Sequence, residues 1–181
     1  TISVLAKDHI PQLGEHVSDR RWYFVRNVVA ILGSTHNAEA LPYLERTLRH
    51  FDPRVRRETI RGAASIKDLR AEQMLASALS DEDPQNVTLA ARYLGNIGSR
   101  SAVPSLELVA RGEGSGNRDV GARVDAIHAL ARIAQQSSVL VLEGITTRRG
   151  LLKREPKEVV AAAEAAARHI RATAAKGGAT S

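Results

Sequence analysis

The sequence contains no cysteine among its 181 residues, which excludes disulfide bonds and thiolate metal sites. Aromatic residues are scarce, with one tryptophan, three tyrosines and two phenylalanines. Because strands are rich in such side chains and helices tolerate their lack, this scarcity favours an all-α chain. No stretch reaches the ~20 uncharged apolar residues of a membrane-spanning helix, and no signal peptide is recognisable. We therefore expect a cytoplasmic protein with no membrane contact.

Motifs of catalysis and metal binding are missing as well. The sequence holds no G-x-S-x-G nucleophile elbow, no HExxH pair and no His-Glu dipeptide. His128, in "DAIHALARI", lies beside an apolar helical stripe, where a structural histidine is expected rather than a ligand. The sequence thus predicts no catalytic residue, no metal site, no cofactor and no small-molecule substrate, and we expect the chain not to be an enzyme.

An internal repeat runs along the chain. A small residue that follows Leu or Ala at a predicted helix end recurs at Gly33, Ala64, Gly95 and Ala131. These positions are 31, 31 and 36 residues apart. A leucine stands 11 residues after each of them, at Leu44, Leu75, Leu106 and Leu142. Apolar residues between these points follow a helical spacing and are interrupted by short connectors, which predicts antiparallel helix pairs. Such pairs bury their apolar faces only by stacking on neighbours, so the repeat predicts a solenoid.

Acidic residues mark the start of each predicted first helix. They occur in Asp52-Pro53, Asp83-Pro84, Asp119 and Glu155-Pro156. A carboxylate at this position accepts hydrogen bonds from free amides of the first turn, and proline tolerates that turn. The spacing of these residues therefore predicts helix N-caps that repeat with the same period.

The segment "DPRVRRETIRGAASI", residues 52–66, resembles a HEAT repeat in its bacterial PBS-lyase-like form. The resemblance covers roughly residues 1–172. It implies an all-α, right-handed α-α superhelix, a HEAT-type solenoid of about four to five helical-hairpin repeats. It also implies a protein-interaction scaffold, since most members of the family have that role and a few bind nucleic acid or chromophore-carrying proteins. A resemblance to HEAT-like alkylpurine DNA glycosylases is more remote, because their catalytic aspartate has no identifiable counterpart here.

The predicted organisation is a single repeat domain over residues 1–175. Its parts are a partial repeat (1–18), four repeats (19–50, 52–81, 83–117 and 118–153), a C-terminal capping helix (155–175) and a flexible tail (176–181). Thr1 is not an initiator methionine, and the first residues read as the end of a helix. We therefore expect the C-terminal fragment of a larger, bacterial-type protein.

Half of the aromatic residues lie side by side in "DRRWYFVRN", residues 19–27. Phe24 aligns with Val55 and is expected in the core. Three consecutive helical residues cannot all face one core, which leaves two alternatives for Trp22 and Tyr23. Either Trp22 packs over the preceding loop, or the pair belongs to an exposed patch with neighbouring arginines, a composition typical of interfaces.

The leading hypothesis is a non-catalytic scaffold that binds another protein or another domain of the parent chain. Its binding surface is expected on the exposed sides of the second helices, extended by the aromatic pair. The predicted partner-binding residues are Trp22, Tyr23, Tyr43, Arg46, Arg49 and Gln73.

The alternative is binding of nucleic acid or another polyanion. The formal net charge is +6, and residues 45–70 carry eight basic against four acidic residues. Arg56 and Arg123 share the column in which HEAT repeats usually carry an arginine that bridges to a neighbouring acidic cap. Other arginines align between repeats and predict a ladder along a phosphate backbone, made of Arg26, Arg54, Arg57, Arg61 and Arg92.

Overall fold

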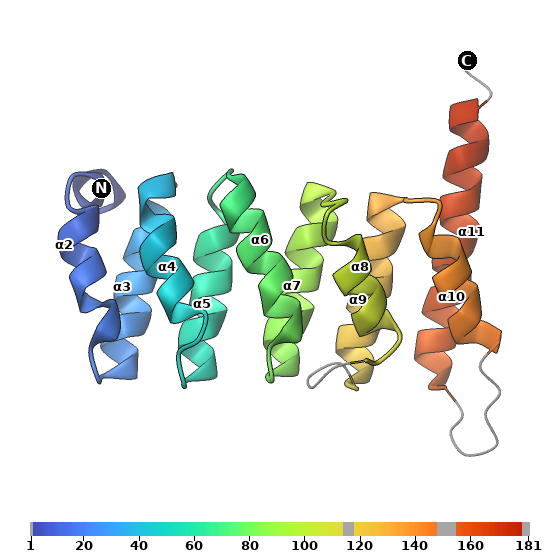
Figure 1. Ribbon diagram of the computed structural model, residues 1–181, viewed down its shortest axis with the longest axis horizontal. Helices are drawn as coiled ribbons and strands as arrows, with labels where there is room; N and C mark the ends of the chain where they lie inside the picture. Colours follow the sequence, from blue (N-terminus) through green and yellow to red (C-terminus); the bar gives the residue numbers. More distant parts are fainter. Residues whose placement is uncertain (1, 114–117, 148–154, 179–181) are drawn as a thin grey trace. The chain divides into compact units, whose positions relative to one another are not determined.

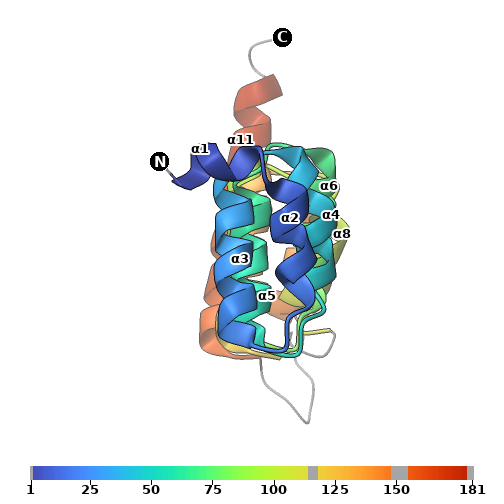
Figure 2. The same ribbon diagram turned by 90° about the vertical axis from the view of Figure 1, so that its left-hand side faces the viewer.

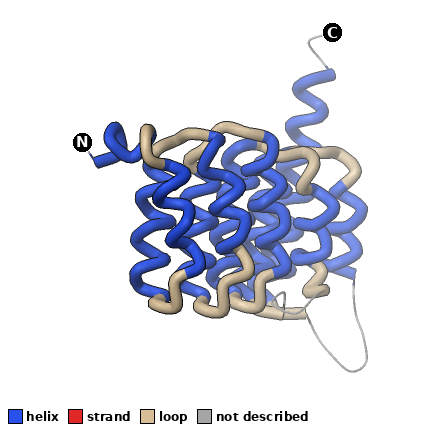
Figure 3. Tube along the Cα trace, turned by 60° about the vertical axis from the view of Figure 1, so that its left-hand side comes forward, coloured by secondary structure: helices blue, strands red, loops and turns tan. Residues whose placement is uncertain are grey.

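The computed structural model describes residues 2–113, 118–147 and 155–178. Within these ranges every regular element is a helix (Figure 3), so the prediction of an all-α chain is confirmed. By its internal contacts the chain divides into two compact units, unit 1 (Thr1–Ala78) and unit 2 (Leu79–Ser181). The grouping of all repeats into a single domain stays a prediction.

Unit 1 consists of helix pairs arranged in two layers. Helices α3 and α5 lie side by side in one layer, and α2, α4 and α6 form the other (Figures 1 and 2). The elements are α1 (Ile2–Lys7), α2 (Ile10–Gly14), the 3-10 helix η1 (Glu15–Ser18), α3 (Trp22–Ser34), η2 (Ala38–Ala40), α4 (Leu41–Thr47), α5 (Pro53–Ala64) and α6 (Leu69–Ser77). A further 3-10 helix, η3 (Ala78–Ser80), spans the boundary to unit 2.

Helix α5 shows how the sequence directs a first helix. The Asp52 carboxylate accepts a hydrogen bond from the backbone N–H of Arg54 at 2.9 Å, and Pro53 opens the helix. One face then buries Val55 and Ile60 completely. Because Asp83 and Asp119 cap their helices in the same way, the capping role predicted for the three aspartates is confirmed.

Helices α3 and α5 approach each other closely where neither has a side chain. A Cβ atom added to Gly33 would lie 2.6 Å from the Cα of Gly62, so the two backbones are in contact there. Nearby in the core, the buried hydroxyl of Thr59 in α5 forms a hydrogen bond of 2.7 Å with the buried hydroxyl of Thr47 in α4, so each has a polar partner. The close packing of α3 on α5 thus depends on Gly33 and Gly62 at the crossing.

Unit 2 repeats this arrangement. Helices α7 and α9 lie side by side, α9 also packs on α11, and α8 and α10 form the second layer (Figure 1). The elements are α7 (Pro84–Ile97), α8 (Val103–Ala110), α9 (Val120–Ile133), α10 (Ser138–Thr147) and α11 (Lys157–Gly178). Helix α11 continues to Gly178, three residues past the predicted end of the capping helix at 175. The structure does not describe residues 114–117 and 148–154. The predicted repeat boundary at 117/118 lies at the edge of the first of these segments, and the predicted repeat end at 153 lies in the second.

A buried arginine connects successive repeats of unit 2. Arg123 donates from Nε to the carbonyl of Ala110 at 3.0 Å, and its Nη2 lies 2.7 Å from a carboxylate oxygen of Glu155. Only 7% of Arg123 is exposed, so its charge is balanced inside the protein by the acid that precedes α11. The predicted bridge from this arginine column to a neighbouring acidic residue is therefore confirmed for Arg123.

Candidate interaction surfaces

A stacked pair of side chains joins the first turns of α3 and α5 in unit 1. The guanidinium carbon of Arg54 lies 3.4 Å from the centre of the Trp22 ring, a cation–π contact. Arg54 also donates from Nε and Nη2 to the two carboxylate oxygens of Asp52, at 3.0 and 2.7 Å. These hydrogen bonds hold the pKa of Asp52 below its usual range and raise that of Arg54. Trp22 is thereby half-buried beneath a fixed arginine.

Two aromatic rings that are close in sequence to the stacked residues are exposed. Tyr23 is 54% exposed and meets Trp22 edge-on, with ring centres 6.0 Å apart. Phe51, which precedes Asp52, is 72% exposed and stacks on His50 at 4.3 Å. Exposed aromatic rings thus stand in the first turn of α3 and just before the Asp52 cap of α5. We call this surface the aromatic edge, comprising Arg21, Trp22, Tyr23, Phe51 and Arg54.

Phe24 does not occupy the core position predicted for it. It is half-buried, contacts the His16 ring edge-on at 5.7 Å and lies under the Arg21 guanidinium at 4.8 Å. Val25 is the residue that is completely buried at this point of α3. The reason is that Phe24 faces the short 3-10 helix η1, which covers a bulky ring less completely than a full repeat would.

The remaining predicted partner-binding residues lie on the second-helix layer of unit 1. Tyr43 is half-buried because its ring packs on Gly14, which has no side chain to block it, and the Arg46 guanidinium lies 5.8 Å from that ring. Arg49 and Gln73 are exposed. The structure therefore brings the predicted residues onto two surfaces rather than one: Trp22 and Tyr23 on the aromatic edge, and Tyr43, Arg46, Arg49 and Gln73 on α4, α6 and the residues just after α4.

Most arginines of the predicted ladder are engaged with neighbouring residues. Arg54 pairs with Asp52, Arg61 with Glu58 at 3.1 Å and Arg92 with Asp125 at 2.9 Å. Arg26 donates to the amide oxygen of Asn27 at 3.0 Å, and Arg57 is half-buried. The three ion pairs reduce the positive charge that these side chains offer to a polyanion.

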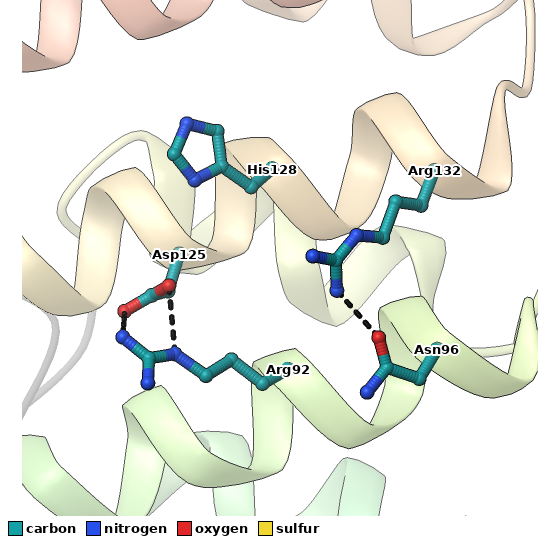
Figure 4. A pocket seen from close by; sticks show the side chains of 5 residues that line it. All are labelled: Arg92, Asn96, Asp125, His128 and Arg132. Carbon is teal, nitrogen blue, oxygen red and sulfur yellow. Dashed lines mark hydrogen bonds and ion pairs between the residues drawn. The ribbon is translucent and has the colours of Figure 1, made fainter.

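Unit 2 contains a polar hollow that the sequence analysis did not identify. It encloses about 370 Å³ between α7 and α9 (Figure 4). His128 is exposed here, which corrects its expected structural role: in α9 the buried stripe is formed by the residues on either side of it. The lining residues are Arg92, Asn96, Asp125, His128 and Arg132. Their spacing, four apart on α7 and three and four apart on α9, was the signal available in the sequence.

Neither a metal-ligand cluster nor a membrane-spanning helix is found in the described residues. No group of histidine and acidic side chains within residues 2–113, 118–147 and 155–178 is arranged to hold a metal ion. In the same part of the chain, no helix has both the length and the apolar character needed to cross a bilayer.

Comparison with known families supports the repeat architecture. A family model described as HEAT repeats matches residues 44–118, so this segment consists of HEAT repeats and the resemblance is confirmed. The match does not distinguish the PBS-lyase-like form. No curated protein matches the chain.

Solved structures are similar in fold. A crystal structure of an engineered protein from the Northeast Structural Genomics Consortium is 20% identical over 93% of this chain and 82% of its own, with a TM-score of 0.57. A second engineered protein from the same consortium is 21% identical over 90% of this chain and 47% of its own, with a TM-score of 0.55. Human deoxyhypusine hydroxylase in complex with glycerol reaches a TM-score of only 0.47 at 14% identity, over 90% of this chain and 84% of its own. At these identities the likeness of the engineered proteins extends to the fold alone.

Proposed function

We propose that this chain, whose residues 44–118 are HEAT repeats, is a non-catalytic scaffold that binds another protein or another domain of its parent chain. Stacked helix pairs hold side chains in fixed positions along an extended surface, which suits recognition of a macromolecule. The sequence offers no nucleophile motif or metal-ligand spacing to suggest a reaction.

The aromatic edge is the observation that carries this proposal. Tyr23 and Phe51 are the exposed aromatic rings among the described residues of unit 1, whereas its other exposed large apolar side chains, Leu5 and Leu69, are aliphatic. Rigid aromatic side chains next to arginines are enriched among the residues that dominate interface energies. Arg54 holds Trp22 in place, so part of the surface is organised before a partner arrives.

The test is affinity capture with matched variants of the full chain. The baits are the wild type, a Tyr23→Ala/Phe51→Ala variant of the aromatic edge and a Tyr43→Ala/Arg49→Ala variant of the second-helix layer. Each lysate is divided into nuclease-treated and untreated halves, and bound proteins are quantified by mass spectrometry. We expect one set of proteins to survive nuclease and to fall at least about tenfold with the aromatic-edge variant only, since such residues each contribute ~1–2 kcal/mol or more.

Other outcomes discriminate between surfaces and partners. Loss with the second-helix variant alone would move the binding surface to α4. Recovery of nucleic acid, with loss of all proteins after nuclease, would contradict the scaffold proposal and favour the arginine ladder, whose binding should weaken steeply with salt. Purified candidates are then titrated against the same three baits to measure each dissociation constant.

A further inference from the structure

We propose that the polar hollow between α7 and α9 binds a carboxylate group, of the kind carried by an aspartate or glutamate side chain. This site lies in unit 2 and does not depend on the aromatic edge of unit 1. Either of the two surfaces can therefore fail its test without affecting the other.

The hollow exists because α7 and α9 touch at small residues. A Cβ atom added to Gly95 would lie 2.8 Å from the Cα of Ala129, so the backbones meet there. Arg92 and Asn96 stand on α7 on either side of this crossing, one turn apart, and longer side chains from α9 face them (Figure 4). Long polar side chains thus surround a helix crossing whose contact residues are only glycine and alanine.

The two cross-helix pairs differ in charge. Arg92 donates from Nε and Nη2 to both oxygens of Asp125, at 2.9 and 3.0 Å, and this pair is neutral overall. Arg132 instead donates to the amide oxygen of Asn96, which has no charge to balance it (Figure 4). Among the five described residues that line the hollow, the Arg132 guanidinium is therefore the one positive charge without an acidic partner.

Donors remain available around that charge. A guanidinium has several N–H groups, and within the described residues Arg132 is seen to use one of them. His128 lies one turn away on the same helix, is exposed, and makes no hydrogen bond to a described residue. Both side chains can donate to an oxygen that enters the hollow.

These features favour a carboxylate over other groups. The planar fork of a guanidinium matches the two oxygens of a carboxylate, and a single negative charge balances the single positive one. A phosphate carries more charge and would be repelled more strongly by Asp125, which lines the same hollow. Apolar ligands would meet a wall in which all five side chains are polar.

Asp125 acts in this arrangement as an internal competitor. Its carboxylate occupies Arg92 in the geometry that an external carboxylate would adopt. Replacing Asp125 by asparagine removes the negative charge and leaves a second arginine in the hollow without a charged partner. The affinity for a carboxylate should then rise, an effect that a purely structural role for these residues would not produce.

The test is an NMR titration of the isotope-labelled full chain that follows the Asn96 side-chain amide and the Arg132 Nε–H. The probes are N-acetylglutamate N-methylamide, its glutamine counterpart, free glutarate and inorganic phosphate. The variants are Arg132→Gln and Asp125→Asn, with Arg100→Gln as the control, since Arg100 is exposed, follows α7 and does not line the hollow. Backbone spectra show whether each variant remains folded.

The proposal expects saturable shifts with the glutamate probe that the glutamine probe does not produce. Affinity should fall about tenfold in Arg132→Gln, stay unchanged in Arg100→Gln and rise several-fold in Asp125→Asn. Tighter binding of the glutamate probe than of glutarate assigns the carboxylate to a protein segment, and the reverse assigns it to a small free acid. The proposal is overturned by an absence of shifts, by equal shifts with the glutamine probe, by tighter binding of phosphate or by no gain in Asp125→Asn.

Discussion

The guanidinium carbon of Arg54 lies 3.4 Å from the centre of the Trp22 ring, while Nε and Nη2 of the same side chain donate hydrogen bonds to Asp52. Replacing Arg54 by lysine keeps the charge but loses both the planar stacking and the two-point hydrogen bond. Because the arginine side chain is half exposed and water screens the ion pair, we expect a small but measurable decrease in the free energy of unfolding. Urea denaturation followed by circular dichroism measures it. The control is Arg49→Lys, on an exposed arginine outside the stack, and equal losses in both would contradict the prediction.

Adding a single methyl group at the crossing of α7 and α9 should destabilise the protein. In Gly95→Ala the new Cβ would lie 2.8 Å from a backbone atom of Ala129, so the helices must separate. We expect a loss of ~1–3 kcal/mol in the free energy of unfolding, as for other overpacked cores. The matched control is Gly144→Ala in α10, where nothing lies within 4 Å of the added atom and alanine should stabilise the helix by ~0.5–1 kcal/mol. Opposite signs for the two variants in urea denaturation are the diagnostic result.

The ends of α7 and α9 offer a second pair of variants. Ala134 closes α9 with a φ of 55°, a left-handed conformation that a Cβ atom disfavours, whereas Gly98 closes α7 with a φ of 71°. Ala134→Gly should therefore raise the free energy of unfolding by up to ~1 kcal/mol, and Gly98→Ala should lower it by a similar amount. Thermal unfolding of the two variants provides the measurement, and a destabilised Ala134→Gly would refute the assigned strain.

Asp19 should titrate well below an ordinary aspartate. Its pKa lies at about 2, against 3.8 normally, mainly because the Arg21 side chain and backbone N–H donate to its carboxylate. A folded-state pKa below the unfolded one means that the ionised pair stabilises the protein above the unfolded pKa and loses this effect as the pH falls toward 2. Carboxyl carbon NMR across this range measures the midpoint. In Arg21→Gln the midpoint should return toward 3.8, and an unchanged value would show that another group depresses it.

Local signals allowed much of the fold to be predicted. The aspartates that cap α5, α7 and α9 act within one helical turn, so their sequence context is sufficient to identify them. The bridge from Arg123 to Glu155 followed from the resemblance to HEAT repeats, because it joins the same two columns in successive repeats.

Contacts that depend on helix crossing angles were not predictable in the same way. The repeat period aligns Gly33 with Ala64 but does not say which residues touch: Gly33 meets Gly62, and Gly95 meets Ala129. Helices that cross at an angle bring different columns together, and a sequence period carries no information about that angle.

The candidate surfaces were the least predictable feature. The stacking of Arg54 on Trp22 and the hollow beside Arg132 arise from side-chain conformations between neighbouring repeats, which no local pattern specifies. Phe51 was missed because a lone aromatic residue before a helix cap has no periodic signature.

Trp22 is the single tryptophan of the chain, and it sits at the aromatic edge of unit 1 under Arg54. Intrinsic fluorescence is therefore a site-specific optical reporter: its emission senses the polarity around one ring, whereas the far-ultraviolet signal sums over all helices. Unfolding curves recorded by both signals would coincide only if unit 1 melts together with the rest of the chain. A partner that covers the aromatic edge would shift this emission directly, so binding can be followed without attaching a dye.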